Sequence, residues 1–373
     1  MRRAAFVYEE AQSRHVLRKD HVFQPNRLQL TYELLQCYGA FEDSLLVTPK
    51  IAEETDLLSF HTADYVEAVK SLSRGEERED AAAFNFSAAG DNPPYEGMYE
   101  VSAMAVGASL LAATLVARGE VDVAFNISGG LHHAAPDCAS GFCVFNDAVI
   151  AILSLVKQGL RIAYVDIDAH HGDGVQHAFY ESDQVLTISL HEWGRYLFPG
   201  TGGVGDIGKG AGTGYSVNLP LFPYTDDQTY LWAFREIVPP LVERFKPDML
   251  VTQLGCDTHY LDPLTHFMLT TAGYAEAVKE LRSLAPKWVA LGGGGYEMGV
   301  VARAWTLAYG VMAEREWPDE IPAEYQQRYG LKRLRDEDKL TIDGASGERE
   351  QVRQFAEQGV AEIKRTVFPL LSL

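Results

Sequence analysis

The chain has 373 residues, of which 47% are hydrophobic and 23% are charged. This composition excludes a disordered chain, because it supplies enough apolar side chains for a large buried core. The formal net charge of −20 repels the phosphates of nucleic acids and of acidic membranes, and it favours cationic partners. We therefore expect neither a nucleic acid nor a membrane as a partner.

The chain has few features of a secreted or membrane protein. Its four cysteines are too few and too scattered for a disulfide scaffold. Glu9 and Glu10 interrupt the start of the sequence before the apolar core of a signal peptide develops. The longest apolar stretch, residues 104–117, is shorter than the roughly 20 residues that a membrane span needs. These features predict a reduced cytoplasmic protein.

From residue 101 onward, helix-length stretches alternate with short apolar runs that are rich in β-branched residues. The runs end at Gly, Asp or His and predict buried strands at residues 121–128, 162–166, 185–190, 249–254 and 288–291. Helices are predicted at residues 101–117, 148–157, 228–245 and 271–284. Such alternation predicts an α/β fold, in which a parallel sheet carries helices on both faces.

The two ends of the chain are less regular. Residues 75–91 are charged and contain Gly, Ala and Pro, which predicts a long loop. Residues 315–373 form a charged C-terminal extension that includes a predicted helix at 348–367. Because the composition does not change between residues 121 and 303, we expect a single domain over residues 1–373, with this extension packed on it.

Four predicted strands lead directly into polar or titratable side chains. The segments that follow them are GGLHH (129–133), DIDAHHGDG (166–174), GCD (255–257) and GGGGY (292–296). The carboxyl ends of parallel strands form the edge of the sheet where α/β proteins bind ligands. We therefore expect these segments to meet in one site.

The segment 166–174 has the pattern of a metal site. Residues two apart in an extended chain point the same way, so Asp166, Asp168 and His170 converge as the strand opens into its loop. Carboxylate and imidazole groups suit Zn²⁺ or another divalent first-row metal. Asp257 would complete a three-ligand set that leaves a position open for water, as in catalytic sites. The alternative is that these residues only turn the chain and cap a helix that starts near Gly174.

His132 and His133 are adjacent and precede a small loop, which suggests an acid and a base at one reacting centre. Each would need a carboxylate to fix its tautomer, and Asp166 and Asp173 are the acids available in the same loop. The four glycines before Tyr296 allow close approach of the backbone to a ligand, so that the phenol donates to a developing oxyanion. The alternative for Tyr296 is a core aromatic residue after a Gly-rich turn.

Along the chain, these segments and three further short motifs follow one another in a fixed order. They are GLHH (130–133), SGFC (140–143), DIDAHHGDG (166–174), SLH (189–191), FPGTG (198–202), GCD (255–257) and GGGGY (292–296). Together they resemble the motifs of the zinc-dependent histone deacetylase superfamily over residues 27–305. Segment 257–266 looks most like the bacterial acetoin-utilisation branch of that superfamily. The resemblance implies an arginase/deacetylase-like fold with about eight parallel strands.

The resemblance also implies roles for individual residues. The metal, Zn²⁺ or Fe²⁺, would be held by Asp168, His170 and Asp257. His132 and His133 would be the base and acid pair, with Asp166 and Asp173 as their carboxylate partners. Tyr296 would polarise the substrate carbonyl. Gly141, Phe142 and Phe198 would line the substrate tunnel, and Asp91 would lie at its rim. Arg27 would lie in an internal cavity. Leu197 stands where many relatives have a second aromatic residue at the tunnel mouth.

The family further implies structural K⁺ or Na⁺. One monovalent site would use Asp166, Asp168, His170, Ser189 and Leu190. A second would use Phe179, Ser182, Val185 and Tyr215.

The implied reaction is hydrolysis of Nε-acetyl-lysine in proteins to lysine and acetate. An apolar tunnel between Phe142 and Phe198 suits the four-carbon stem of acetyl-lysine. It would also admit an acetylated polyamine, a cationic acetylated small molecule, so an acetylpolyamine amidohydrolase is the alternative. A metal-bound ligand sensor without turnover is a second alternative, whereas an arginase-like two-metal cluster needs more ligands than the sequence offers.

Overall fold

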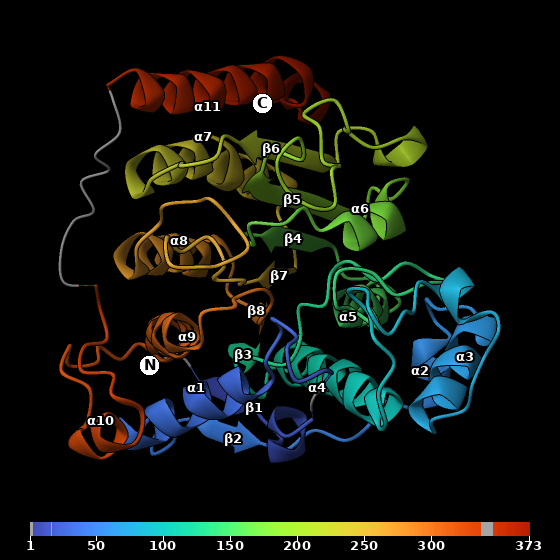
Figure 1. Cartoon of the computed structure of the whole chain (residues 1–373). Coiled ribbons are helices and arrows are strands. Elements are labelled where there is room, and N and C mark those ends of the chain that lie inside the picture. The colour runs from blue at the N-terminus through green and yellow to red at the C-terminus, as the bar shows by residue number, and fades with distance from the viewer. Residues whose placement is uncertain (1–2, 16, 337–345) are drawn as a thin grey trace.

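The computed structural model describes residues 3–15, 17–336 and 346–373, and Figure 1 shows its central sheet. In these residues the sheet has eight parallel strands in the order β2-β1-β3-β8-β7-β4-β5-β6. The strands are β1 (Ala4–Val7), β2 (Leu45–Val47), β3 (Val123–Asn126), β4 (Ile162–Asp166), β5 (Val185–Glu192), β6 (Ser216–Leu221), β7 (Met249–Gln253) and β8 (Trp288–Leu291). The predicted fold class, a parallel sheet with helices on both faces, is confirmed.

Each central strand buries both of its faces. In β4, Ala163 and Val165 face one hydrophobic core, whereas Ile162 and Tyr164 face another on the opposite side of the sheet. This follows from the period of two along a strand. Because neither face meets water, the strand sequences are apolar throughout, and for that reason they were recognisable as short continuous apolar runs.

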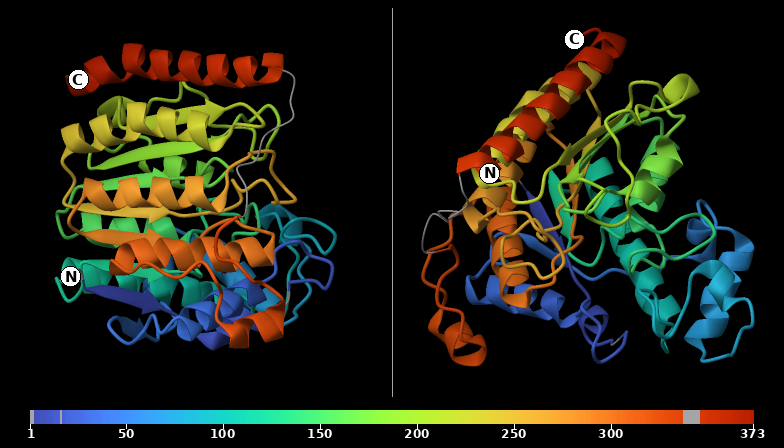
Figure 2. Two further views of the ribbon diagram at one scale, coloured as in Figure 1. Left: turned by 90° about the vertical axis from the view of Figure 1, so that its left-hand side faces the viewer. Right: turned by 45° about the horizontal axis from the view of Figure 1, so that its top comes forward.

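Helices cover both faces of the sheet, as the two views of Figure 2 show. One layer contains α1 (Asn26–Cys37), α7 (Asp227–Phe245), α8 (Thr271–Leu284) and α9 (Met298–Ala313). The other contains α4 (Met98–Ala117), α5 (Asp147–Val156) and α6 (Asp173–Phe179), with α2 (Glu54–Leu57) and α3 (Ala63–Ser73) at its outer side.

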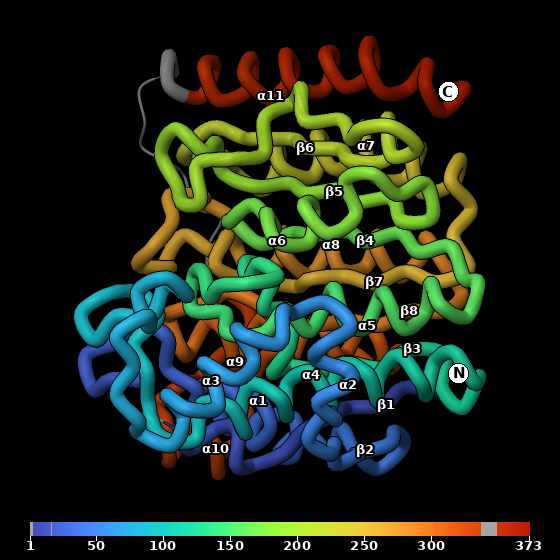
Figure 3. The backbone as a smooth tube through the Cα atoms, turned by 90° about the vertical axis from the view of Figure 1, so that its right-hand side faces the viewer, coloured from blue at the N-terminus to red at the C-terminus, as the bar shows by residue number. Residues whose placement is uncertain are grey.

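The helix of the C-terminal extension, α11 (Ser346–Thr366), packs against the edge strand β6 and against α7. Figure 3 shows it running along that end of the molecule. Ala356, Val360 and Ile363 belong to the same core as the sheet and α7. A short helix, α10 (Ala323–Tyr329), comes before α11 in the same extension and contacts α1. Residues 337–345 of the extension lie outside the described part.

Helix α4 has 20 residues and is apolar enough, by length and composition alone, to cross a membrane. It is longer than the apolar stretch expected from the sequence. In the fold it packs against β3, α5 and α3, and Val106, Ala108 and Ala112 are fully buried. These are the contacts of a core helix, in which apolar residues are needed on every side.

The structure differs from the expected elements in several details. β3 begins two residues later than predicted, and β5 runs on to Glu192. β1, β2 and β6 were not among the predicted strands: β1 and β2 are very short, and β6 contains Asn218 and Pro220. The predicted loop 75–91 contains one 3₁₀ turn, Ala81–Phe84.

Candidate active site

The four strands whose ends carry polar residues are neighbours in the sheet. Their order across it is β3-β8-β7-β4, although they come from distant parts of the chain. All are parallel, so their carboxyl ends lie at one edge and the segments that follow them meet there. The sheet topology therefore creates the common site that the strand endings predicted.

Asp168, His170 and Asp257 form a buried cluster at this edge, with one potential ligand atom from each residue within 4.8 Å of the others. The Nδ1 atom of His170 lies 2.8 Å from Oδ2 of Asp257 and 3.1 Å from Oδ1 of Asp168. Asp168 and His170 follow β4, and Asp257 follows the adjacent strand β7. The two aspartates are held in place by backbone groups, since Gly294 N–H donates to Asp168 and Ala169 N–H donates to Asp257.

Two glycines leave the room that the carboxylates occupy. A Cβ atom at Gly294 would lie 2.1 Å from Oδ2 of Asp257, and one at Gly255 would lie 2.1 Å from Oδ2 of Asp168. Any larger residue at either position would displace a carboxylate. The glycines after β7 and β8 are therefore required by the close approach of backbone to side chain.

The cluster fits a divalent cation. Burial and the neighbouring charge of Asp168 raise the pKa of Asp257 above its usual value, because the two carboxylates share one buried site. A dication between them would offset this repulsion. Two carboxylates and one imidazole are also a donor set that Zn²⁺ and Fe²⁺ accept. Asp168, His170 and Asp257 are thus the residues able to hold the metal.

His132 and His133 lie beside the cluster as a hydrogen-bonded pair. Their Nε2 atoms are 3.0 Å apart, and each Nδ1 atom lies 2.7 Å from a carboxylate oxygen, of Asp166 for His132 and of Asp173 for His133. Each Nδ1 therefore carries the hydrogen, which leaves the Nε2 atoms for chemistry. Asp166 is fully buried and also accepts a hydrogen bond from Tyr164 at 2.7 Å.

The two histidines have opposite pKa shifts. Burial opposes protonation of His132, but the charges of Asp166 and Asp168 outweigh it and raise its pKa to about 9. Burial and the charge of His132 lower the pKa of His133 to about 4, although Asp173 acts in the other direction. One ring is therefore favoured as a cation and its neighbour as a neutral base, a separation typical of acid–base pairs in enzymes.

Tyr296 faces the same space. Its ring lies 6.3 Å from that of His170 and 5.8 Å from that of Phe142, and its backbone N–H donates to Asp262 at 2.8 Å. Burial and the charges of Asp257 and Asp168 raise the pKa of the phenol well above its usual value. The phenol is consequently a proton-bearing donor at neutral pH.

Aromatic side chains lead from this centre to the surface. A Cβ atom at Gly141 would meet the rings of His133 and Phe198, so this glycine lets the two approach. The ring of Phe198 packs edge-on to that of His133 at 5.0 Å, and its side chain is 43% exposed. Phe142 has a positive φ of 68°, and its N–H donates to Asn92. Asp91 is exposed next to Asn92, and its carbonyl accepts a hydrogen bond from His21.

Comparisons with known proteins show the family of this chain. Residues 21–312 match the histone deacetylase domain, which is most of the chain. The chain belongs to the histone deacetylase family. It is 41% identical over 333 residues to the acetoin utilization protein AcuC of Bacillus subtilis, covering 87% of this chain and 86% of that protein. It is 37% identical over 331 residues to human histone deacetylase 1, covering 88% of this chain and 68% of the human protein.

A solved structure supports the fold. The crystal structure of a histone deacetylase homologue from Aquifex aeolicus superposes with a TM-score of 0.85 at 29% identity, covering 96% of this chain and all of that one. The deacetylase chain described here thus has the arginase/deacetylase fold.

The positions that the deacetylase resemblance suggested for monovalent cations lie on adjoining segments. Ser189 is paired with Asp166 in the β4–β5 ladder and is followed by Leu190, close to the loop of Asp168 and His170. The second set lies at the other end of β5. Phe179 ends α6, Ser182 N–H donates to the carbonyl of Phe179, Val185 begins β5, and the carbonyl of Tyr215 accepts from Thr187.

Arg27 of the deacetylase is buried behind the cluster. Its guanidinium lies 4.5 Å from the ring of Phe23 and 5.1 Å from that of Trp305, and it donates to the carbonyl of Gly295 at 2.7 Å. It lines a cavity of about 40 Å³ together with His15 and Tyr95. Arg27 therefore lies between this cavity and the Gly-rich segment that ends at Tyr296.

Sequence reasoning missed two groups that hold the cluster. Gln253, the last residue of β7, donates from Nε2 to Asp168 at 2.5 Å and accepts the N–H of Gly255. Asp262 accepts the N–H groups of Tyr296 and Leu264. For Gln253, the available signal in the sequence was a polar residue at the end of a mostly apolar strand. Asp262 lies in a loop where nothing local distinguishes it.

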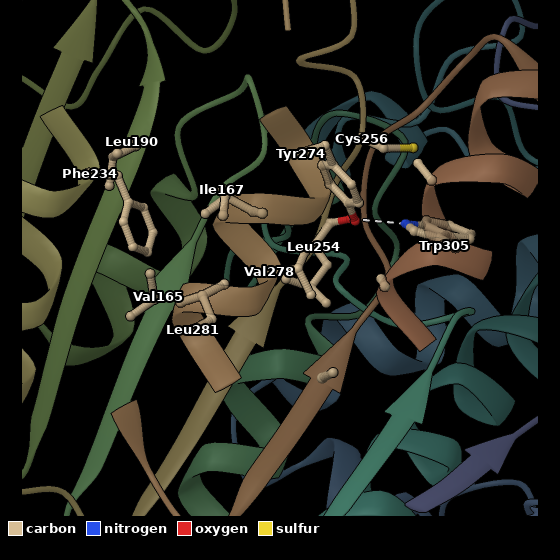
Figure 4. Packing of buried hydrophobic residues seen from close by; sticks show 14 of the residues in the cluster. Val165, Ile167, Leu190, Phe234, Leu254, Cys256, Tyr274, Val278, Leu281 and Trp305 are labelled. Atoms are coloured by element: carbon tan, nitrogen blue, oxygen red, sulfur yellow. Dashed lines mark hydrogen bonds between the residues drawn. The ribbon is translucent and has the colours of Figure 1, made fainter. Parts of the chain in front are cut away.

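The segment before the cluster is fixed by the core. The carbonyl of Leu254 accepts hydrogen bonds from Tyr274 at 2.8 Å and from Trp305 at 2.9 Å. Figure 4 shows these residues with Cys256 at the junction of α8, α9 and the sheet. Two buried aromatic donors from different helices thus lock the backbone three residues before Asp257.

Proposed function

We propose that this protein is a metal-dependent deacetylase that hydrolyses the Nε-acetyl-lysine amide of proteins to lysine and acetate. The observation that carries the proposal is the cluster of Asp168, His170 and Asp257 next to the His132–His133 pair. Three donors leave positions on a bound metal for water and substrate, which is typical of catalytic rather than structural sites.

The metal would be held by Asp168, His170 and Asp257, with Zn²⁺ or Fe²⁺ as the ions that this donor set suits. When bound, it supplies Lewis acidity for the scissile carbonyl and for the attacking water.

The residues of the chain divide the proton transfers between them. Neutral His133 accepts a proton from water at Nε2, and Asp173 steadies the resulting cation through Nδ1. His133 then delivers this proton to the lysine nitrogen as the amide bond breaks. His132, whose Nδ1–H is held by Asp166, lies against His133 and fixes the position of its ring beside the reacting atoms.

Tyr296 acts on the oxygen of the substrate carbonyl. Its phenol donates a hydrogen bond to the negative charge that develops there, and the raised pKa keeps the phenol protonated. Phe142 and Phe198 enclose the methylene stem of the lysine, and Gly141 lets the walls come close. Asp91, exposed near Phe142, binds the substrate backbone at the rim.

A monovalent cation, K⁺ or Na⁺, would stabilise the loop that carries the cluster. Asp166, Asp168, His170, Ser189 and Leu190 would surround it, because the loop after β4 and the end of β5 adjoin there. A second cation would lie among Phe179, Ser182, Val185 and Tyr215. Both positions are proposals drawn from the family resemblance and from the adjacency of these segments.

The deciding experiment measures acetate released from an acetyl-lysine peptide and from N-acetylspermidine, each with and without a metal chelator. We expect chelator-sensitive release, with the higher kcat/KM on the peptide. A preference for acetylspermidine would replace the protein substrate by a polyamine. If neither compound releases acetate but both bind, the protein would be a sensor, and the hydrolase proposal would be wrong.

A further inference from the structure

A buried ionic cluster connects the C-terminal segment to the loop that follows Asp257. The carboxylate of Asp336 accepts hydrogen bonds from Nε2 of His259 at 3.0 Å, from the N–H and hydroxyl of Thr271 at 2.8 and 3.0 Å, and from Arg303 at 2.8 Å. The side chain of Asp336 is only 9% exposed, and that of His259 is 2% exposed. Every partner is a donor, so the site requires an ionised carboxylate.

This cluster joins two regions that are far apart in the sequence. Asp336 lies beyond residues 21–312, which match the family domain, whereas His259 lies two residues after Asp257. The Nδ1 atom of His259 accepts the N–H of Leu261 at 3.2 Å, so Nε2 carries the hydrogen that Asp336 accepts. The orientation of the imidazole is therefore fixed from both sides.

His259 occupies the centre of a tight turn at the active site. Its N–H donates to the carbonyl of Cys256, and its carbonyl accepts the N–H of Asp262. The turn thus begins beside Asp257, which belongs to the Asp168–His170–Asp257 cluster. It ends at Asp262, which accepts the backbone N–H of Tyr296. A shift of His259 moves both ends of the turn.

We propose that Asp336 is a positioning residue of the active site, which acts through His259 on the placement of Asp257 and Tyr296. The C-terminal extension then helps to position the active-site residues through Asp336. The effect on turnover rests on the function proposed above, whereas the effect on metal affinity does not.

The test compares Asp336→Asn with Thr271→Val. The side chain of asparagine has one oxygen and one NH₂ group, so the NH₂ group would face at least one of the donors that bind Asp336. His259 then either loses its acceptor or competes with the other donors for the remaining oxygen. The valine removes the Thr271 hydroxyl and its contact with Asp336 but leaves the contact of Asp336 with His259. Asp227→Asn is a second control, because Asp227 holds Thr270 at the same end of α8 and makes no hydrogen bond with His259 in the described structure.

We expect D336N to lower kcat about tenfold or more with KM unchanged, and to weaken Zn²⁺ affinity about tenfold in a chelator competition, as for supporting residues of other metal sites. T271V and D227N should lower the melting temperature but keep kcat and Zn²⁺ affinity within about twofold of the wild type. The double variant D336N/H259L should be no less active than H259L alone, since both changes break the same link.

The proposal is overturned if D336N keeps wild-type kcat and Zn²⁺ affinity. It is also overturned if T271V reduces both quantities as much as D336N does, because Asp336 would then act only by stabilising the fold. A wild-type protein that releases no acetate would contradict the proposed function alone, and the Zn²⁺ titration would still decide the role of Asp336.

Discussion

The Nε2 atoms of His132 and His133 lie 3.0 Å apart, while their Nδ1 atoms point to different carboxylates. A contact of this length between two ring nitrogens requires one hydrogen between them. Asp166, the more buried carboxylate, raises the pKa of His132, so the hydrogen lies on His132 and the Nε2 atom of His133 is the unprotonated one. The structure thus shifts the pKa values of two adjacent and chemically identical side chains in opposite directions.

Replacing His133 by alanine should abolish most turnover without loss of metal. Removal of a general base and acid lowers kcat about 100-fold or more, and His133 lies outside the Asp168–His170–Asp257 cluster. Acetate release and elemental analysis of the purified variant check both parts. His177→Ala is the control, since His177 is exposed on α6. Wild-type turnover in the His133 variant would exclude the assigned role.

Tyr296→Phe should fold as the wild type does and lose about 100-fold in kcat. The ring contacts with Phe142 and His170 remain, and only the donor to the substrate oxyanion is removed. Steady-state kinetics on an acetyl-lysine peptide and a thermal melt are the measurements. Tyr224→Phe, at a tyrosine that is 52% exposed, should change neither quantity. An unchanged kcat for Y296F would show that the phenol has no part in the reaction.

Gly294→Ala should reduce metal binding although no ligand is altered. The added methyl group would lie 2.1 Å from Oδ2 of Asp257 and 2.8 Å from Oδ2 of Asp168, so at least one carboxylate has to move. We expect a metal content far below one ion per chain after dialysis, measured by elemental analysis. Gly205→Ala, where a Cβ meets no atom within 4 Å, should retain the full content. Equal metal in both variants would contradict this view of the cluster.

His61 should make the stability of the protein depend on pH. It is buried, its Nδ1–H donates to the carbonyl of Pro136, and its Nε2 accepts the N–H of Asn146. Burial lowers its pKa to about 4, although the hydrogen bond to Pro136 opposes the shift. The unfolded chain takes up the proton near the ordinary value of about 6.5, so stability is lost as the pH falls from there towards 4.

The expected loss from this one residue between pH 7 and pH 5 is about 2 kcal/mol of unfolding free energy. Urea unfolding of the wild type and of His61→Gln at both pH values gives the change in unfolding free energy between pH 7 and pH 5 for each protein. The difference between these two changes is the contribution of His61. The glutamine does not titrate and offers both a donor and an acceptor. An identical pH dependence in the two proteins would show that His61 is not the residue responsible.

The sequence allowed prediction of the parts of the fold that are buried on both sides. The cores of β4, β7 and β8 were evident because apolar runs closed by polar residues have few other interpretations in a parallel sheet. β2 was missed since its exposed residues Leu45 and Leu46 carry no pattern. β6 was missed since Pro220 argues against a central strand, and in the fold this strand lies at the edge of the sheet.

For the site, the order of the strands was the missing information. The sequence indicates that polar residues follow several strands, but not that β8 and β7 stand between β3 and β4. The residues predicted from the sequence are those with chemistry of their own, such as His170 and Tyr296. Gln253, Asp262 and Asp336 support them through hydrogen bonds across long sequence separations, and no local pattern reveals such contacts.

The position of α11 has a consequence for the behaviour of the protein in solution. Without that helix, the outer side of β6, which is twice as long as β2 at the opposite end, would offer unpaired backbone groups and an apolar surface to other molecules. A chain cut before Ser346 would therefore tend to associate strand to strand and precipitate, even with its catalytic side chains intact. We therefore expect α11 to protect this edge of the sheet from pairing with other chains.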